Sequence, residues 1–478
     1  MRAGALAGLV GGIAFGAAMI ELGLLPTIAS LVRAESDIVG FVLHMVVAAA
    51  VGAGFGAFVH AQRPAVDETL YWGLVYGAVW WFLGAATLLP LLSGESLPWD
   101  VESARDLFPA LLGHLIYGVV TASAFVLLNR KLAPFRVVPS SIARGVVAGI
   151  AGAALLGTAA SESFGGPVVS ASMIDQSRPV AWLVTIGLGA LAGAVYGLIH
   201  PRARTGLGPS VIRGVSYGFA WWVIGALTLV PLVAGDGLRW SVDQVRAGFE
   251  TFPGYLLFLG AGLAAIHHGL TALFRSLFAD DLSEAAEEGL GTRGLRASFQ
   301  GVVAGLAGGL IFTIVMARIG FLGTVAALIG AESTAAGVVV HLVISVTIGV
   351  AYGLLFIRRS HDQGAGLGWG IAYGVFWWLL GPLTLLPVLL GDGPQWTVAA
   401  ATEAFPALIG HIAYGAVLGA IFFRLESRRD PWWISRSESE ARRAQLATQQ
   451  LLSSAPGLWA LSIIIALAVP VLLAMPTP

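Results

Sequence analysis

The chain has 478 residues, of which 57% are hydrophobic and only 11% charged, whereas soluble domains carry about 25% charged residues. This composition excludes an ordinary soluble fold, and the lack of cysteine excludes disulfides, iron–sulfur clusters and thiolate metal sites. The net charge of −1 does not indicate a nucleic-acid partner, which would favour a basic chain.

One motif occurs three times along the chain. It consists of Tyr-Gly, a Trp pair, and then Gly, Thr and Pro at constant spacing, with the Tyr at positions 76, 217 and 373. The first and third copies align without a gap, and the second takes a three-residue insertion between Trp240 and Phe252. Such self-similarity indicates a repeated structural unit.

Each copy contains four apolar runs near the ~20 residues that cross the ~30 Å hydrocarbon layer. We therefore expect an all-α polytopic protein whose first partner is the lipid bilayer. The predicted parts are four-helix units at 1–135, 141–276 and 298–427, an acidic linker at 277–297, a charged cytoplasmic helix at 428–456, and a thirteenth span at 457–474.

Within each unit, local signals mark the helices in order. Glycines at four-residue spacing in helix 1, such as Gly8 and Gly305, predict close helix packing, a glycine zipper. A serine precedes helix 2, and helix 3 carries the Trp pair. The next loop predicts a short helix capped by Asp100, Ser241 or Thr397, with Trp99, Trp240 and Trp396 as interfacial anchors.

Basic residues indicate the orientation. All but six of the 26 Lys and Arg residues fall on the side that holds the N-terminus, here called the basic side. The positive-inside rule makes this side cytoplasmic, so we expect an inner-membrane protein with its N-terminus inside and, with thirteen spans, its C-terminus outside. The six on the outer side are Arg33, Arg105, Arg178, Arg239, Arg246 and Arg318.

Four histidines lie within the predicted spans. His44 and His114 fall at similar depth in unit 1, counted from Glu35 and Asp106, and His341 and His411 repeat them after Glu332 and Glu403. Unit 2 has Thr185 and, by the sequence alignment, Phe258 instead. Intramembrane ionisable residues are candidates for function. These pairs can hydrogen-bond in a packed bundle, relay protons, ligate haem b, or hold a metal ion with carboxylates.

Two further charged groups are candidate sites. Acidic residues recur in the outer loops and would attract cations; they are Glu95, Asp236, Asp392 and Glu250, together with Asp106 and Glu403. The other group aligns at the outer end of helix 1, where Glu21, Glu162 and Arg318 would form a central charge cluster if the units surround a threefold axis.

No nucleotide-binding, zinc-protease or serine-nucleophile motif is present, so the sequence does not favour an enzyme. The order His341, Tyr352, a Trp-rich helix, Glu403-Ala-Phe-Pro and Gly410-His411 resembles an uncharacterised family of four-helix bacterial inner-membrane proteins. The resemblance covers one unit, so it implies a triplication and a bacterial inner membrane.

Three functions remain open from the sequence. The first is transport, or a channel, for a small cation or protons through the histidine sites. The second is a haem- or metal-binding membrane subunit that uses the same histidines. The third is a structural or assembly subunit of a membrane complex whose other partners the sequence does not identify.

Overall fold

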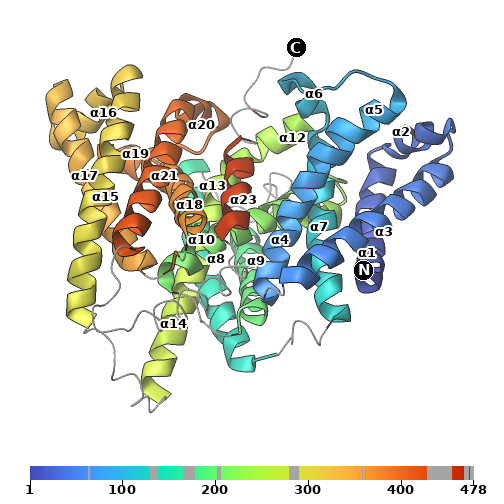
Figure 1. Ribbon diagram of the computed structural model, residues 1–478, viewed down its shortest axis with the longest axis horizontal. Coiled ribbons are helices and arrows are strands. Elements are labelled where there is room, and N and C mark those ends of the chain that lie inside the picture. Colours follow the sequence, from blue (N-terminus) through green and yellow to red (C-terminus); the bar gives the residue numbers. More distant parts are fainter. Residues whose placement is uncertain are drawn as a thin grey trace.

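The computed structural model describes residues 1–62, 65–129, 137–164, 178–201, 206–278, 290–357, 359–360, 362–427, 455–467 and 473. Every regular element among these residues is a helix, and 12 helices are long and apolar enough to cross a membrane. The chain is therefore an all-α polytopic membrane protein (Figure 1). The charged linker residues 279–289 and the segment 428–454 lie outside the described residues.

Unit 1 has four long helices and several short ones. The long helices are α1 (Arg2–Glu21), α3 (Asp37–Gln62), α4 (Val66–Trp80) and α7 (Phe108–Leu128). Helix α4 runs on through the π-helical segment η2 (Trp81–Leu88) into α5 (Leu89–Ser93), and the predicted short helix is α6 (Val101–Asp106). The pair α2 (Leu25–Ala29) and η1 (Ser30–Val32) was not predicted.

Units 2 and 3 follow the same order. Unit 2 consists of α8 (Pro139–Phe164), α9 (Arg178–Ile199), α10 (Leu207–Trp221), η4 (Trp222–Leu229), α11 (Val230–Ala234), α12 (Val242–Ala247), η5 (Phe249–Thr251), α13 (Phe252–Gly254), η6 (Tyr255–Gly262) and α14 (Leu263–Phe278). Unit 3 consists of α15 (Leu290–Arg318), α16 (Leu322–Ala326), η7 (Ala327–Ile329), α17 (Thr334–Phe356), α18 (Gln363–Leu380), η8 (Gly381–Leu385), α19 (Leu386–Leu390), α20 (Val398–Glu403) and α21 (Phe405–Ser427).

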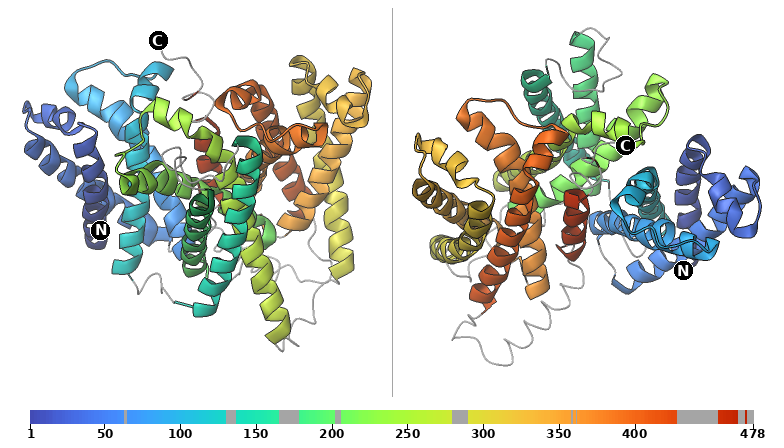
Figure 2. Two further views of the ribbon diagram at one scale, coloured as in Figure 1. Left: turned by 180° about the vertical axis from the view of Figure 1, so that it is seen from behind. Right: turned by 90° about the horizontal axis from the view of Figure 1, so that it is seen from above.

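The three groups of helices surround a common centre when the molecule is seen from above (Figure 2). Helix α23 (Ala455–Leu467) lies against both α18 and α4 and so joins units 3 and 1. Its 13 described residues are fewer than the ~20 of a span, and most of the predicted remainder, 468–474, lies outside the described residues.

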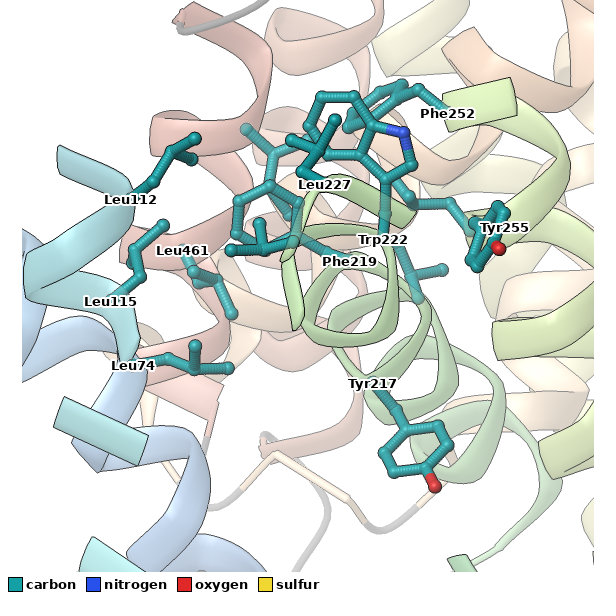
Figure 3. Packing of buried hydrophobic residues seen from close by; sticks show 14 of the residues in the cluster. Leu74, Leu112, Leu115, Tyr217, Phe219, Trp222, Leu227, Phe252, Tyr255 and Leu461 are labelled. Carbon is teal, nitrogen blue, oxygen red and sulfur yellow. The ribbon is translucent and has the colours of Figure 1, made fainter. Parts of the chain in front are cut away.

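The core lies where the units meet. Phe219 and Leu227 of unit 2 lie toward Leu112 and Leu115 of unit 1 in a single cluster of buried residues, in which Trp222 packs against Phe252 (Figure 3). Leu461 of α23 enters the same cluster. Burial of large apolar side chains at this junction stabilises the contact between parts that are far apart in the sequence.

Small residues let the helices of each unit approach closely. A β-carbon at Gly8 of α1 would collide with the carbonyl oxygen of Ala48 in α3, and one at Gly305 of α15 would lie 2.7 Å from that of Ser345 in α17. The third and fourth long helices of unit 1, α4 and α7, meet in the same way, because Gly77 of α4 faces the carbonyl of His114 in α7. The tyrosine of the motif also joins α4 to α3, since Tyr76 donates a hydrogen bond to the carbonyl of Val51.

The Thr and Pro of the motif have a shared role in the π-helical segments. Thr228 donates a hydrogen bond to the carbonyl five residues earlier, that of Val223, and accepts one from the indole of Trp240 at 3.0 Å. Pro231 has no N–H for the carbonyl of Leu227, so the amide of Arg239 donates to it at 3.3 Å. The outer loop thus closes over the widened helix.

Unit 3 repeats this arrangement, and unit 1 keeps only part of it, since Trp99 still donates to Thr87, at 3.3 Å. Trp396 donates to Thr384 at 3.0 Å, and the amide of Gln395 donates to the carbonyl of Leu383. In unit 1 the residue before Trp99 is Pro98, which has no amide hydrogen to donate. Trp99 is 60% exposed, whereas Trp240 and Trp396 are each 1% exposed.

The burial of two tryptophans corrects the prediction of interfacial anchors, and the hydrogen bonds of the short helices confirm the predicted caps. Trp240 and Trp396 are packed loop residues rather than interfacial anchors. The predicted caps are present, since Asp100, Ser241 and Thr397 each accept a hydrogen bond from the backbone amide three residues on.

Candidate functional site

The two histidines of unit 1 pack against one phenylalanine. The ring of Phe15, on α1, lies 5.5 Å from that of His44 on α3 and 4.9 Å from that of His114 on α7, measured between centroids. Gly113 admits this ring, because a β-carbon there would collide with Phe15. The Gly-His pair therefore has a structural explanation: the glycine makes room for the ring that the histidine contacts.

Backbone carbonyls determine which nitrogen of each imidazole carries the hydrogen. Nε2 of His44 lies 3.0 Å from the carbonyl oxygen of Gly12, and Nδ1 of His114 lies 2.7 Å from that of Ala110. A carbonyl oxygen only accepts, so both of these nitrogens are donors. In the neutral rings, Nδ1 of His44 and Nε2 of His114 then keep their lone pairs.

Unit 3 reproduces the ring packing and the bond of the helix-4 histidine, but its helix-2 histidine donates from the other nitrogen. The ring of Phe312 lies 4.9 Å from that of His341 and 4.6 Å from that of His411. His411 donates from Nδ1 to the carbonyl of Ala407 at 2.8 Å. The hydroxyl of Thr313 donates to the carbonyl of Gly309 and so accepts from Nδ1 of His341 at 2.9 Å, which leaves Nε2 of that ring with its lone pair.

The lone pairs of the helix-4 histidines face the π-helical segments. A β-carbon at Gly84 of η2 would lie 4.0 Å from Nε2 of His114, and one at Gly381 of η8 would lie 3.9 Å from Nε2 of His411. Both histidines are half-buried, whereas His44 and His341 are 8% and 5% exposed. Each pair thus has one enclosed imidazole and one whose basic nitrogen borders a widened turn of helix 3.

Unit 2 lacks this site. The residue that stands in place of His114 is not the one that the sequence alignment predicts. Thr185 occupies the place of His44 and bonds to the carbonyl of Ala181. Gly218 faces the carbonyl of Tyr255, just as Gly77 faces that of His114, and Leu156 contacts Gly254 as Phe15 contacts Gly113. Tyr255, rather than Phe258, therefore replaces His114. The insertion before Phe252 is compensated, because the stretch from Phe252 to Gly254 is shorter than the matching stretch from Phe108 to Gly113 in unit 1.

The carboxylates predicted beside the histidines lie apart from them. Glu35, Glu332, Asp106 and Glu403 are exposed, and within the described residues none of them has a hydrogen bond or ion pair to a histidine. Among the described residues no group of three His, Asp or Glu is arranged to hold a metal ion.

The outer acidic residues belong to the loop surface. Glu95, Asp236 and Asp392 are exposed and Glu250 is half-buried; Asp236 pairs with Arg239 at 2.9 Å. Asp106 lines a cleft of about 310 Å³ between α6 and α12, together with Glu102, Arg105 and Asp243.

The predicted central charge cluster does not form between units 1 and 3. Glu21 ends α1 and Arg318 ends α15, and these helices lie at opposite ends of the molecule's longest axis (Figure 1). Glu21 instead accepts a hydrogen bond at 2.8 Å from the backbone amide of Leu238 in the outer loop of unit 2. Helix 1 is peripheral in its unit, so its end does not reach the centre. The side chain of Glu162 lies outside the described residues.

Three residues that contact the histidines were not predicted from the sequence, namely Phe15, Phe312 and Thr313. The two phenylalanines align with each other and with Leu156, so they are lost from unit 2 along with the histidines. Their replacement together with the histidines is the sequence signal by which the two phenylalanines could have been assigned to the site.

The fold and the sites define a multi-pass α-helical membrane protein with a histidine pair within each of two helical units. Comparison with known proteins adds no relative, since no family model, curated protein or solved structure matches the chain.

Proposed function

We propose that this membrane protein transfers protons through the histidine pairs of units 1 and 3. The observation that carries the proposal is the tautomeric arrangement of the helix-4 histidines. Their Nδ1 atoms are held by carbonyls of Ala110 and Ala407, and Nε2 is left with a lone pair beside a π-helical turn. Histidine is the side chain whose ordinary pKa suits reversible proton exchange near neutral pH.

The distribution of the site supports the same proposal. Unit 2 keeps the packing of the motif, with Tyr217 bonded to the carbonyl of Ala192 and Trp240 bonded to Thr228. It replaces both imidazoles and their phenylalanine at once. The packing of the motif in unit 2 therefore does not require imidazoles at these positions.

Haem ligation by a pair is less well supported. Two axial imidazoles must each present a nitrogen to one iron at a bond length of ~2 Å. Nε2 of His44 already donates to Gly12, and the ring of Phe15 contacts both imidazoles, so a macrocycle would have to displace this packing. A metal site would need further ligands, and the predicted carboxylates are exposed elsewhere.

The setting that we propose is the one expected from the sequence: a bacterial inner membrane, with the basic side in the cytoplasm. The exposed carboxylates Glu95, Asp236 and Asp392 would then concentrate cations, protons included, at the opposite face.

Ion flux into liposomes tests the proposal. The purified protein is reconstituted with a pH-sensitive dye inside, and a potassium diffusion potential drives cations inward. We expect acidification above that of protein-free liposomes, unchanged when sodium is replaced by a large organic cation. Flux of sodium or potassium without acidification would favour a cation channel, and no flux of either would leave the structural role. An absorbance spectrum with a Soret band would favour haem.

A further inference from the structure

A second group of ionisable side chains lies at the end of unit 2 that faces the basic side. Four corresponding positions lie at this end of every unit, and two of them are in ring contact in each unit. In units 1 and 3 they are apolar or aromatic, namely Phe55, Val59, Trp72 and Phe125, and Tyr352, Phe356, Trp369 and Phe422. In unit 2 they are Tyr196, His200, Arg213 and His267.

The equivalence of His267 and Phe125 rests on contacts, because unit 2 has one extra residue before Gly260. Gly260 faces the carbonyl of Gly214 as Gly118 faces that of Gly73, and His267 and Phe125 each follow seven residues later. Phe55 lies 6.0 Å from Phe125, Tyr352 lies 5.5 Å from Phe422, and Tyr196 lies 5.3 Å from His267, measured between centroids. Three of the four positions are basic residues in unit 2 alone, the unit that lacks the histidine pair.

Unit 1 supplies the opposite charges. Arg213 on α10 lies 3.5 Å from the carboxylate of Asp67 and 3.1 Å from that of Glu68, both on α4. Glu68 and Arg213 are 8% and 6% exposed, so the pairs are largely shielded from water. Asp67, whose side chain is 18% exposed, also lies 3.7 Å from Nε2 of His200. Asp67 is therefore shared between an arginine and a histidine of the neighbouring unit.

The orientation of His200 is set by its other nitrogen. Nδ1 lies 3.1 Å from the carbonyl oxygen of Tyr196 and must donate to it, and the two rings stack at 4.1 Å. The neutral ring therefore turns the lone pair of Nε2 toward the carboxylate of Asp67 and the hydroxyl of Tyr71, which lies 3.4 Å away. A lone pair facing a carboxylate is unfavourable, and a proton on Nε2 converts the same contact into an ion pair.

We propose that His200, held between Asp67 and Tyr71 where units 1 and 2 meet, is a proton-binding site on the basic side of the membrane. The proton comes from water on that side through the partly exposed Asp67, and the lone pair of Nε2 forms the new N–H bond. The charged imidazole then competes with Arg213 for Asp67. This site does not depend on the proposed function of units 1 and 3.

Surrounding groups act on His200 in both directions. Burial lowers the pKa of His200, the carboxylate of Asp67 raises it, and Arg213 lowers it, with a net shift downward. The ring is thus neutral at neutral pH and charges on acidification. The charged or titratable groups of the packed elements are Asp67, Glu68 and Tyr71 of α4, Arg144 of α8, Tyr196 of α9, Arg213 and Tyr217 of α10, His267 and His268 of α14, and Arg359 beside Gly206.

Nitrogen-15 NMR of histidine in the full-length protein in lipid bilayers tests the proposal, with His200→Gln to assign the signals. At about pH 8 we expect His200 to carry hydrogen on Nδ1 only, and to become doubly protonated as the pH falls. Asp67→Asn, which preserves shape, should reduce the proton affinity of His200 by roughly tenfold, because an opposite charge within ~4 Å is removed.

A matched control is Glu35→Gln, which removes an exposed carboxylate from the other end of unit 1 and should leave the titration of His200 unchanged. The proposal is overturned if wild-type His200 carries its hydrogen on Nε2 at about pH 8. It is overturned equally if Asp67→Asn titrates like the wild type. The tautomer of the wild type decides the question even if a variant does not fold.

Discussion

Replacing the threonine of the π-helical segment by valine should destabilise units 2 and 3 but not unit 1. Thr228→Val keeps the shape and removes the hydroxyl that accepts from Trp240 and donates to Val223. Trp240 is 1% exposed, so water cannot replace the lost partner. A buried donor left without a partner costs about 1–3 kcal/mol, whereas hydrogen bonds measured within membrane bundles average ~0.6 kcal/mol. We expect ~1–2 kcal/mol for Thr228→Val and for Thr384→Val.

Thr87→Val is the matched control within the same chain. Trp99 donates to Thr87 at 3.3 Å, but it is 60% exposed and can donate to water instead, so the expected cost is below about 0.5 kcal/mol. Equilibrium unfolding in mixed micelles gives the three values. A double-mutant cycle with Trp240→Phe should show that Thr228→Val costs less once the indole donor is gone. Equal losses for Thr87→Val and Thr228→Val would refute the argument that burial of the tryptophan sets the cost.

Three further predictions concern packing, orientation and acid sensitivity. Gly8→Leu and Gly305→Leu should lower the thermal stability of the detergent-solubilised protein, because backbones of neighbouring helices occupy the space; Gly187→Leu, where no atom lies within 4 Å of a β-carbon, should not. A single cysteine at Ala65 should resist a membrane-impermeant thiol reagent added outside cells and one at Glu95 should react; the reverse pattern would overturn the orientation. Hydrogen bonds from the amide and hydroxyl of Ser103 lower the pKa of Asp100, so its cap on α6 is fully present above the ordinary Asp value and is lost as pH falls through the lowered one. Hydrogen exchange at the Ser103 amide should therefore quicken in acid, and less so in Asp100→Asn, whose amide oxygen still caps.

Much of the fold follows from the periodicity of the sequence. Apolar runs of spanning length predict the long helices, and the polar residue before each short outer helix predicts its cap, as at Ser241. The π-helical segments of the Trp-pair helices could not be predicted, because the contacts around them join the helix to a distant loop, as Trp240 donates to Thr228 12 positions earlier. The same contacts bury Trp240, which composition alone places at the interface.

The candidate site was predicted only in part. Equal counts from the outer ends of helices 2 and 4 placed His44 and His114 at one depth, and the structure packs both against Phe15. The prediction that Phe258 replaces His114 in unit 2 was wrong. The insertion before Phe252 is compensated by a deletion after it, so Tyr255 stands at the place of His114. The pairing of Asp67 with Arg213 has no repeat signature, because each residue is charged in one unit only.

The most direct test of proton transfer through the histidine pairs is to give units 1 and 3 the residues of unit 2. The variant carries His44→Thr, His114→Tyr, His341→Thr and His411→Tyr, and its proton flux in liposomes is compared with that of the wild type and of His60→Gln, which changes an exposed histidine at the end of α3. We expect the fourfold variant to fold, as unit 2 does with these residues, and to conduct no more protons than protein-free liposomes, while His60→Gln conducts like the wild type. Wild-type flux from the correctly folded fourfold variant would contradict the account and leave the histidines a packing role.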